Sequence, residues 1–295
     1  MKAKELRELL NSKKLIRVMG AHNGLSAKLA EQAGFDAIWA SGLEISAAHS
    51  VPDANILTMT ENLQAAISMN EATSIPIICD CDSGYGNVNN VIRMVREYER
   101  NGMAGICIED KQFPKLNSFI DGPQKLTPID EFAGKIRAAK DTQSDPDFVV
   151  IARVEALIAG QGLQEALNRA YAYEEAGADA ILIHSKQKQP HEIVSFVELY
   201  KGTAPIVIVP TTYPTLDVEQ IRDFGIQMVI YANHGLRSSI KAMKETFDRI
   251  LREGNTAGVE LDISTMQEVF ELQGMFEMRQ REDRYSSTGS VILNN

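Results

Sequence analysis

The chain has 295 residues, of which 44% are hydrophobic and 24% charged, and its formal net charge is -10. This composition is typical of a globular protein with a sizeable core, and the acidic balance argues against nucleic-acid binding, which needs clustered Lys and Arg. Residues 1–10 lack the apolar core of a signal peptide, and no run approaches the roughly 18 apolar residues of a membrane span. The three cysteines are too few and too scattered for a disulfide framework, so we expect a soluble, cytoplasmic protein.

Short apolar runs alternate with helical spacing along most of the chain. Helical spacing occupies residues 1–11, and a glycine that suits a left-handed helix cap precedes four of the later strands, at Gly34, Gly102, Gly177 and Gly225. Strands are expected at 15–19, 37–40, 75–81, 105–108, 148–154 and 205–209, and within "EEAGADAILIHS" and "IRDFGIQMVIYAN".

Eight strands alternating with helices predict a single (β/α)8 barrel domain. The continuous apolar character of the strands agrees, because parallel strands are covered on both faces. After the eighth strand we expect a helix at 238–252, a polar linker at 253–258, and an amphipathic helix at 264–281 within a C-terminal extension from about 259 to 295. So apolar a helix beyond a complete barrel predicts assembly with further copies of the chain.

Chemistry in such barrels occurs at the carboxyl ends of the strands. Asp80 and Asp82 are two residues apart, so both should face inward while Cys79 and Cys81 face the helices. With Glu109 on the next strand, they would form three converging carboxylates that repel one another unless a cation lies among them. Oxygen ligands favour Mg²⁺ or Mn²⁺, held largely through water.

The polar segment 109–118 follows the strand at 105–108 and predicts an active-site loop, because a buried strand that ends in carboxylates is costly unless the charge is used. Other strand ends are less specific on local grounds. Arg153 suits a bidentate anion but could equally pair with Glu155. The remaining candidates have equally simple structural interpretations: His184 and Trp39 as core residues, and Asp53 as a turn residue after proline.

The residues Glu109-Asp110-Lys111, followed after five positions by Asn117-Ser118, resemble the signature loop of the phosphoenolpyruvate mutase family, whose superfamily includes isocitrate lyase. The segments "GAHNGLSAKLAEQAGF", "IWASGLEISA", "CDCDSGYGN", "IARVEALIAG" and "DAILIHS" resemble family segments in family order. The resemblance covers nearly the whole chain. It implies a modified barrel whose eighth helix is exchanged between protomers, in a homodimer or homotetramer.

The resemblance also implies roles for individual residues. Asp80 would be the acid closest to Mg²⁺, with Asp82 and Glu109 holding its water shell. The small-molecule substrate would be held by a wall at Trp39, a backbone cradle at Ser41, Gly42 and Leu43, and gripping groups at Arg153, His184, Asn117 and Ser118, with Lys115 on the closing loop and Asp53 as an acid essential to phosphoryl transfer.

The activity so implied moves the phosphoryl group of phosphoenolpyruvate from the enol oxygen to carbon 3, giving phosphonopyruvate. Segments around Asp53 and Arg153 are equally similar to phosphonopyruvate hydrolase, which resembles the mutase in the loop but carries Thr where Asn117 stands. A lyase of the 2-methylisocitrate type is a third interpretation, although it usually needs a cysteine in the loop and residues 110–118 contain none. A barrel without catalytic activity, acting as a scaffold, is a fourth.

Overall fold

A computed structural model describes residues 1–12 and 14–289 of the chain. The chain divides into two compact units, Met1–Leu236 and Arg237–Asn295, and each is described by itself. The sequence-based expectation of one domain over the whole chain, with an extension from about residue 259, stays a prediction.

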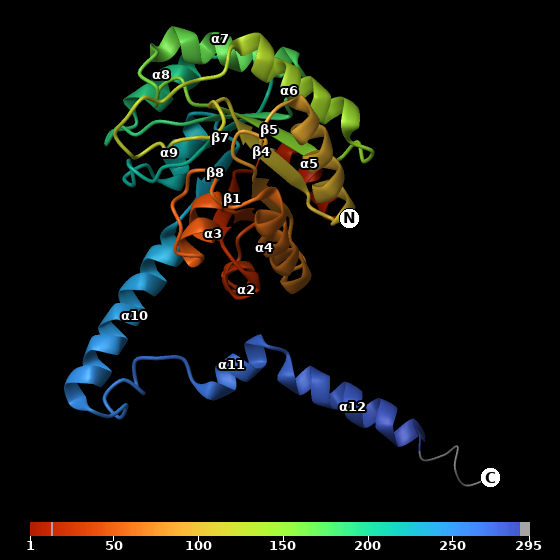
Figure 1. Ribbon diagram of the computed structural model, residues 1–295, viewed down its shortest axis with the longest axis vertical. Helices are drawn as coiled ribbons and strands as arrows, with labels where there is room; N and C mark the ends of the chain where they lie inside the picture. The colour runs from red at the N-terminus through yellow and green to blue at the C-terminus, as the bar shows by residue number, and fades with distance from the viewer. Residues whose placement is uncertain (13, 290–295) are drawn as a thin grey trace. The chain divides into compact units, whose positions relative to one another are not determined.

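The first unit is a closed barrel in which β1 to β8 follow one another in sequence order and all pair in parallel (Figure 1). The predicted (β/α)8 fold is therefore confirmed. The strands are β1 (Ile16–Ala21), β2 (Ala37–Ala40), β3 (Ile77–Asp80), β4 (Gly105–Glu109), β5 (Val149–Val154), β6 (Ala180–Ile183), β7 (Ile206–Ile208) and β8 (Met228–Tyr231).

Helices alternate with these strands, and capping side chains and left-handed glycines mark several of their ends. Asn23 and Asn87 each cap a helix through their side chains. The predicted left-handed glycines are confirmed, with φ of 87°, 77°, 97° and 74° at Gly34, Gly102, Gly177 and Gly225. The helices of this unit are α1 (Lys2–Asn11), α2 (Gly24–Gln32), α3 (Gly42–Ala48), α4 (Met59–Ala72), α5 (Val88–Arg100), α6 (Ile129–Thr142), α7 (Gly162–Glu175), α8 (His191–Leu199) and α9 (Val218–Asp223).

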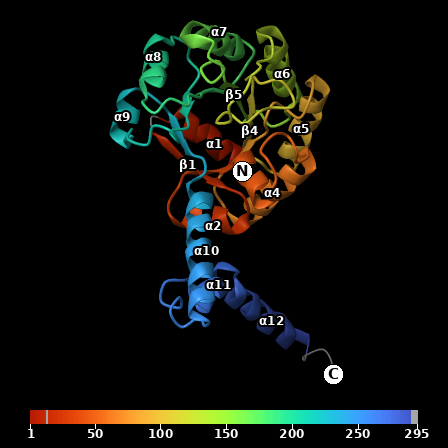
Figure 2. The same ribbon diagram turned by 60° about the vertical axis from the view of Figure 1, so that its left-hand side comes forward.

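Two apolar layers fill the barrel unit. The inner layer combines alternate strand residues with Leu6 and Leu10 of α1, which lies inside the ring of the other helices (Figure 2). The outer layer lies between strands and helices and includes Cys79, as the alternation along β3 predicts, and Cys81, which follows the end of that strand. Arg7 of α1 contacts the Phe148 carbonyl and Asp179, which precede β5 and β6, so α1 covers the amino end of the barrel and leaves the carboxyl end for a site.

The second unit contains most of α10 (His234–Glu253), followed by α11 (Met266–Leu272) and α12 (Met275–Gly289). The predicted single helix over 264–281 is wrong, because α11 ends at Leu272 with Gln273 as its C-cap, and Gly274 takes φ +70°. A left-handed glycine terminates one helix and lets the next start in a new direction.

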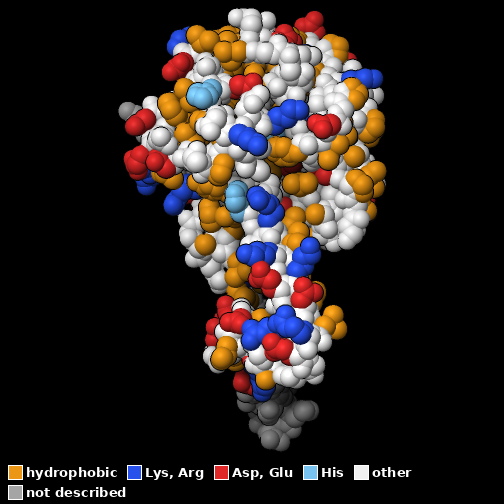
Figure 3. Space-filling model, turned by 90° about the vertical axis from the view of Figure 1, so that its left-hand side faces the viewer, with side chains coloured by type: hydrophobic (Ala, Val, Ile, Leu, Met, Phe, Trp, Pro, Cys, Tyr) orange, Lys and Arg blue, Asp and Glu red, His pale blue; other side chains and the backbone are white. Residues whose placement is uncertain are grey.

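Within the described residues, no helix is long and apolar enough to cross a membrane. Figure 3 shows one face of the molecule, on which acidic, basic and hydrophobic side chains are intermixed.

Candidate active site

A pocket opens at the carboxyl ends of the strands, and most of the residues predicted from the sequence line it. Gly42, Asp82 and Glu109 do not line it but contact residues that do. The predicted residues on its wall are Trp39, Ser41, Leu43, Asp53, Asp80, Lys115, Asn117, Ser118, Arg153 and His184. The structure therefore brings the predicted residues together.

Ser41, Gly42 and Leu43, the residues of the predicted backbone cradle, lie at the start of α3. Ser41 is the N-cap of α3, and its hydroxyl accepts a hydrogen bond from the Glu44 backbone N–H at 3.3 Å. Gly42 lies beside both acids, since a Cβ at this position would be 3.4 Å from a carboxylate oxygen of both Asp80 and Asp82. The two acids predicted to share a face of β3 thus meet at the start of α3.

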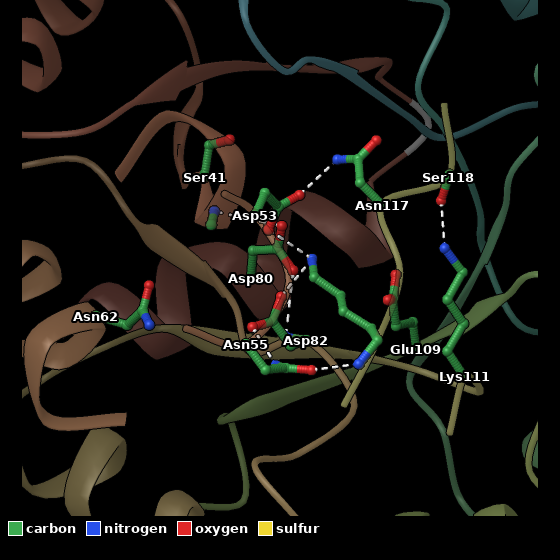
Figure 4. A network of polar contacts seen from close by, with 12 residues as sticks. Ser41, Asp53, Asn55, Asn62, Asp80, Asp82, Glu109, Lys111, Asn117 and Ser118 are labelled. Carbon is green, nitrogen blue, oxygen red and sulfur yellow. Dashed lines mark hydrogen bonds and ion pairs between the residues drawn. The ribbon is translucent and has the colours of Figure 1, made fainter. Parts of the chain in front are cut away.

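The three predicted metal acids are buried. Burial, with repulsion from neighbouring acids, raises the pKa of Asp80, and the same causes raise the pKa of Asp82 to about 7. The positive charge of Lys115 opposes the rise in the pKa of both acids. Its Nζ lies 2.5 Å from Asp82 Oδ1 and 2.9 Å from Asp53 Oδ1. Glu109 Oε2 lies 3.3 Å from Arg153 Nε. Figure 4 shows Asp53, Asp80 and Asp82 side by side, with Glu109 across from them.

In the described part of the chain, no three His, Cys, Asp or Glu side chains are close enough together to hold a metal ion directly. The donor set nevertheless fits a hydrated divalent cation. Glu109 Oε1 is buried and has no hydrogen-bond partner among the residues that the structure describes, although buried carboxylate oxygens are normally paired. An all-oxygen set with such an unpaired acceptor suits Mg²⁺, which keeps several of its waters.

Glu155 is fully buried behind the part of the pocket wall that Ser118, Arg153 and His184 form. Its Oε1 lies 2.5 Å from Arg153 Nε and 2.8 Å from His184 Nδ1, and its Oε2 accepts from the Ser118 hydroxyl at 2.8 Å. Lys111 Nζ lies 3.2 Å from Oε2. Burial alone would raise the pKa of Glu155, but Arg153, His184 and Lys111 hold it well below its ordinary value. The structural Arg153–Glu155 pair left open by the sequence does form, and Arg153 lines the pocket as well.

His184 is buried at the end of β6, and burial lowers its pKa. The imidazole is therefore neutral at pH 7. Its Nδ1 lies 2.8 Å from both Glu155 Oε1 and Arg153 Nη2, so the ring is held between the carboxylate and the guanidinium. Phe119 packs edge-on against the ring, with 5.8 Å between ring centroids.

Residues 111–126, called the lid below, cross the pocket from β4. Lys111 Nζ donates to the Leu116 carbonyl at 2.9 Å and to the Ser118 hydroxyl at 2.6 Å, which fixes the middle of the lid to its start. Asn117 Nδ2 donates to Asp53 Oδ2 at 2.6 Å. Asp53 thus binds Lys115 through one oxygen and Asn117 through the other. Its pKa is lowered: burial raises it, but Lys115 and Asn117 more than compensate.

Asp110 supports the site from behind; it belongs to the signature loop in the sequence, but no role for it was predicted. Its Oδ1 accepts from the Glu155 backbone N–H at 2.9 Å, and its Oδ2 accepts from Tyr173 at 2.8 Å and from Arg169 Nη1 at 3.1 Å. Its backbone carbonyl accepts from the Thr127 N–H at 2.8 Å. One residue therefore joins Glu155, α7 and the end of the lid. Alternation after the inward Glu109 could have suggested an outward buried acid that needs a cation.

Most of this chain is similar in sequence to known proteins. Residues 6–251 match the family model described as "Phosphoenolpyruvate phosphomutase". A phosphoenolpyruvate phosphomutase of Tetrahymena pyriformis is 50% identical over 96% of this chain and 95% of its own length.

Two solved structures are similar over almost all of their length. The phosphoenolpyruvate phosphomutase of Streptomyces platensis subsp. rosaceus has a TM-score of 0.96 and 53% identity, covering 97% of this chain and 100% of that one. A phosphonopyruvate hydrolase in complex with oxalate and Mg++ has a TM-score of 0.92 and 50% identity, covering 97% and 99%.

Proposed function

This chain belongs to the phosphoenolpyruvate phosphomutase family, and we propose that it interconverts phosphoenolpyruvate and phosphonopyruvate. The observation that carries the proposal is the contact of the lid with Asp53. Lys115 and Asn117 reach across the pocket to the two oxygens of this one carboxylate, so the lid covers the place where a phosphoryl group would be transferred. A lid of this kind keeps water from a reactive group.

In the proposed reaction the bond between the enol oxygen and phosphorus breaks, and a bond between carbon 3 and phosphorus forms. No atom is gained or lost, so water must be excluded throughout. Asp80 would hold Mg²⁺ most directly, with Asp82 and Glu109 holding its water shell, and the ion would supply positive charge to the oxygens of the pyruvate enolate. Mn²⁺, which takes the same oxygen ligands, is the other candidate ion.

The chain's own cations and donors suit the transferring group. Arg153 and His184 line the same wall, and Ser118 brings a hydroxyl from the lid. A loose, metaphosphate-like group spreads its charge over its oxygens and is stabilised by such fixed donors. Glu155 holds these three side chains in place through its own two oxygens.

Asp53 orients and gates rather than accepting the phosphoryl group in this proposal. Both of its oxygens are bound, by Lys115 at 2.9 Å and by Asn117 at 2.6 Å, and these contacts, which also lower its pKa, make the carboxylate a weaker nucleophile while the lid is in this position. These contacts instead make Asp53 the residue on which the lid closes.

Phosphonopyruvate hydrolysis is the alternative, and it is supported by the 50% identity to the solved hydrolase. The mutase is favoured because Asn117 occupies the position where the hydrolase is expected to carry Thr, and here its amide binds Asp53. A carbon-carbon lyase is not favoured, since none of the three cysteines lines the pocket and all are buried.

The test is to incubate the purified protein with phosphonopyruvate and MgCl₂ and to follow phosphorus by NMR. Formation of phosphoenolpyruvate is the expected result. Inorganic phosphate with pyruvate as the only products would replace the mutase by the hydrolase. No change in phosphorus, together with cleavage of a methylisocitrate-type acid, would identify the lyase, and inactivity on every substrate would leave a scaffold.

We also propose that the chain forms a homodimer or homotetramer by exchanging C-terminal helices. On α10 the exposed apolar residues Ile240, Met243, Phe247 and Leu251 recur at helical spacing, which is typical of a contact face. Light scattering of the purified chain should give two or four copies, and a monomer would rule the exchange out.

The three buried, unpaired thiols support the expected cytoplasmic compartment.

A further inference from the structure

Asn55 joins parts of the site that are far apart in the sequence. It lies between α3 and α4, two residues after Asp53, and takes a left-handed backbone conformation with φ +58°. Its Nδ2 donates to Asp82 Oδ2 at 2.7 Å, and its Oδ1 accepts from the backbone N–H of Lys115 at 2.6 Å (Figure 4). One side chain therefore contacts both a predicted metal acid and the lid.

These two contacts require an amide. A primary amide presents a donor and an acceptor on one rigid plane, whereas a carboxylate only accepts. Aspartate at this position would still accept from Lys115 but would bring a second negative charge against Asp82. The left-handed backbone is also one that asparagine tolerates better than most residues.

The contact with Lys115 is made to the lid backbone and so does not depend on the lysine side chain. Lys115 Nζ separately contacts Asp53 and Asp82, at 2.9 Å and 2.5 Å. The lid is thus held at residue 115 by two independent attachments, of which one is a cation between acids and the other is the Asn55 amide.

We propose that Asn55 is a positioning residue that latches the lid to Asp82 and thereby keeps water from the transferring phosphoryl group. Asn55 acts through Lys115 and Asp82 and does not itself touch substrate. The part of this inference that concerns water rests on the proposed function, whereas the latch itself does not.

The latch is tested by hydrogen exchange of the lid peptide that contains Lys115, measured without substrate and in EDTA. Asn55→Gly removes the side chain while relieving the positive φ, so that loss of the amide is separated from backbone strain. We expect roughly tenfold faster exchange at Lys115 in this variant, the amount that loss of one hydrogen bond allows. Asn55→Asp should also be faster, because its charge opposes Asp82. Asn101→Asp, at the end of α5, is the control and should leave the lid unchanged.

Unchanged exchange at Lys115 in both Asn55 variants would overturn the latch, whatever the activity. The role in excluding water is tested by the share of turnover that ends as inorganic phosphate. This share should rise in Asn55→Gly and Asn55→Asp relative to the Asn101→Asp control. Faster exchange with an unaltered phosphate share would reduce Asn55 to a structural contact. A wild-type protein that makes no phosphoenolpyruvate would refute the proposed function without affecting the exchange result.

Discussion

Removing the Tyr173 hydroxyl tests the support behind the active site. Tyr173 is fully buried on α7, and its hydroxyl donates to Asp110 Oδ2 at 2.8 Å and accepts from Arg169 Nη1 at 3.0 Å. Burial raises the pKa of Asp110 to about 6, and both Arg169 and the Tyr173 hydroxyl oppose that rise. The substitution Tyr173→Phe deletes one oxygen and leaves the ring packing intact.

The expected loss follows from this geometry. A buried hydrogen bond to a charged group contributes about 1.5–3 kcal/mol to the free energy of unfolding. In a domain of this size 1 kcal/mol corresponds to about 2–4 °C in Tm, so Tyr173→Phe should lower Tm by roughly 3–12 °C. Tyr173 is buried on α7 and is not part of the lid. Opening of the lid therefore cannot compensate for the lost hydrogen bond.

Tyr213→Phe is the matched control. Tyr213 is also fully buried, but its hydroxyl, although near the Val209 backbone, has no hydrogen-bond partner in acceptable geometry among the described residues. Removing it should change stability by no more than about 0.5 kcal/mol, or increase it. Both variants are followed by circular dichroism during heating and in urea. Equal losses in the two variants would refute the assignment of Asp110, Arg169 and Tyr173 as a supporting network.

Three further predictions concern charge. In metal-free protein Lys115→Met should lower Tm, because Asp53 and Asp82 lose their shared cation, and MgCl₂ should then raise Tm more than in the wild type; equal responses to MgCl₂ would contradict this. EDTA should abolish turnover, and turnover retained in EDTA would remove the metal argument. Because burial lowers the pKa of His184, the folded state binds fewer protons than the unfolded chain below about pH 6.5, so stability should fall with acidification in that window. Urea midpoints at about pH 7.5 and 5.5 should therefore differ less in His184→Asn than in the wild type, and identical differences would show that His184 does not titrate in this way.

Much of the barrel could be predicted because its signals are local. Gly34 and Gly177 mark helix ends through a conformation that glycine adopts easily, and the apolar runs that follow them can only be buried strands. The side chains of Asp80 and Cys79 point in opposite directions, toward the pocket and toward the helices, as the two-residue period of a strand predicts. The predicted helix over 264–281 is wrong because Gly274, with its positive φ, ends α11 instead of continuing the helix.

The supporting residues could not be predicted, because their partners are distant in sequence. Asn55 contacts residues 27 and 60 positions away, and Arg169 and Tyr173 meet Asp110 from 59 and 63 positions away. The spacing of apolar residues along the chain does not say which residue of α7 will contact the end of β4. Such pairings follow from the packing of helices on the barrel, which only the folded chain shows.

The central claim is that the lid, through Asn117, keeps water from the phosphoryl group, and one comparison tests it most directly. Wild type and Asn117→Thr are incubated in parallel with phosphonopyruvate and MgCl₂, and the ratio of phosphoenolpyruvate to inorganic phosphate is measured by phosphorus NMR. Loss of the 2.6 Å contact to Asp53 should shift the ratio toward phosphate, from a wild type that forms mainly phosphoenolpyruvate. An identical ratio in the two proteins, or a wild type that forms mainly phosphate, would contradict the claim.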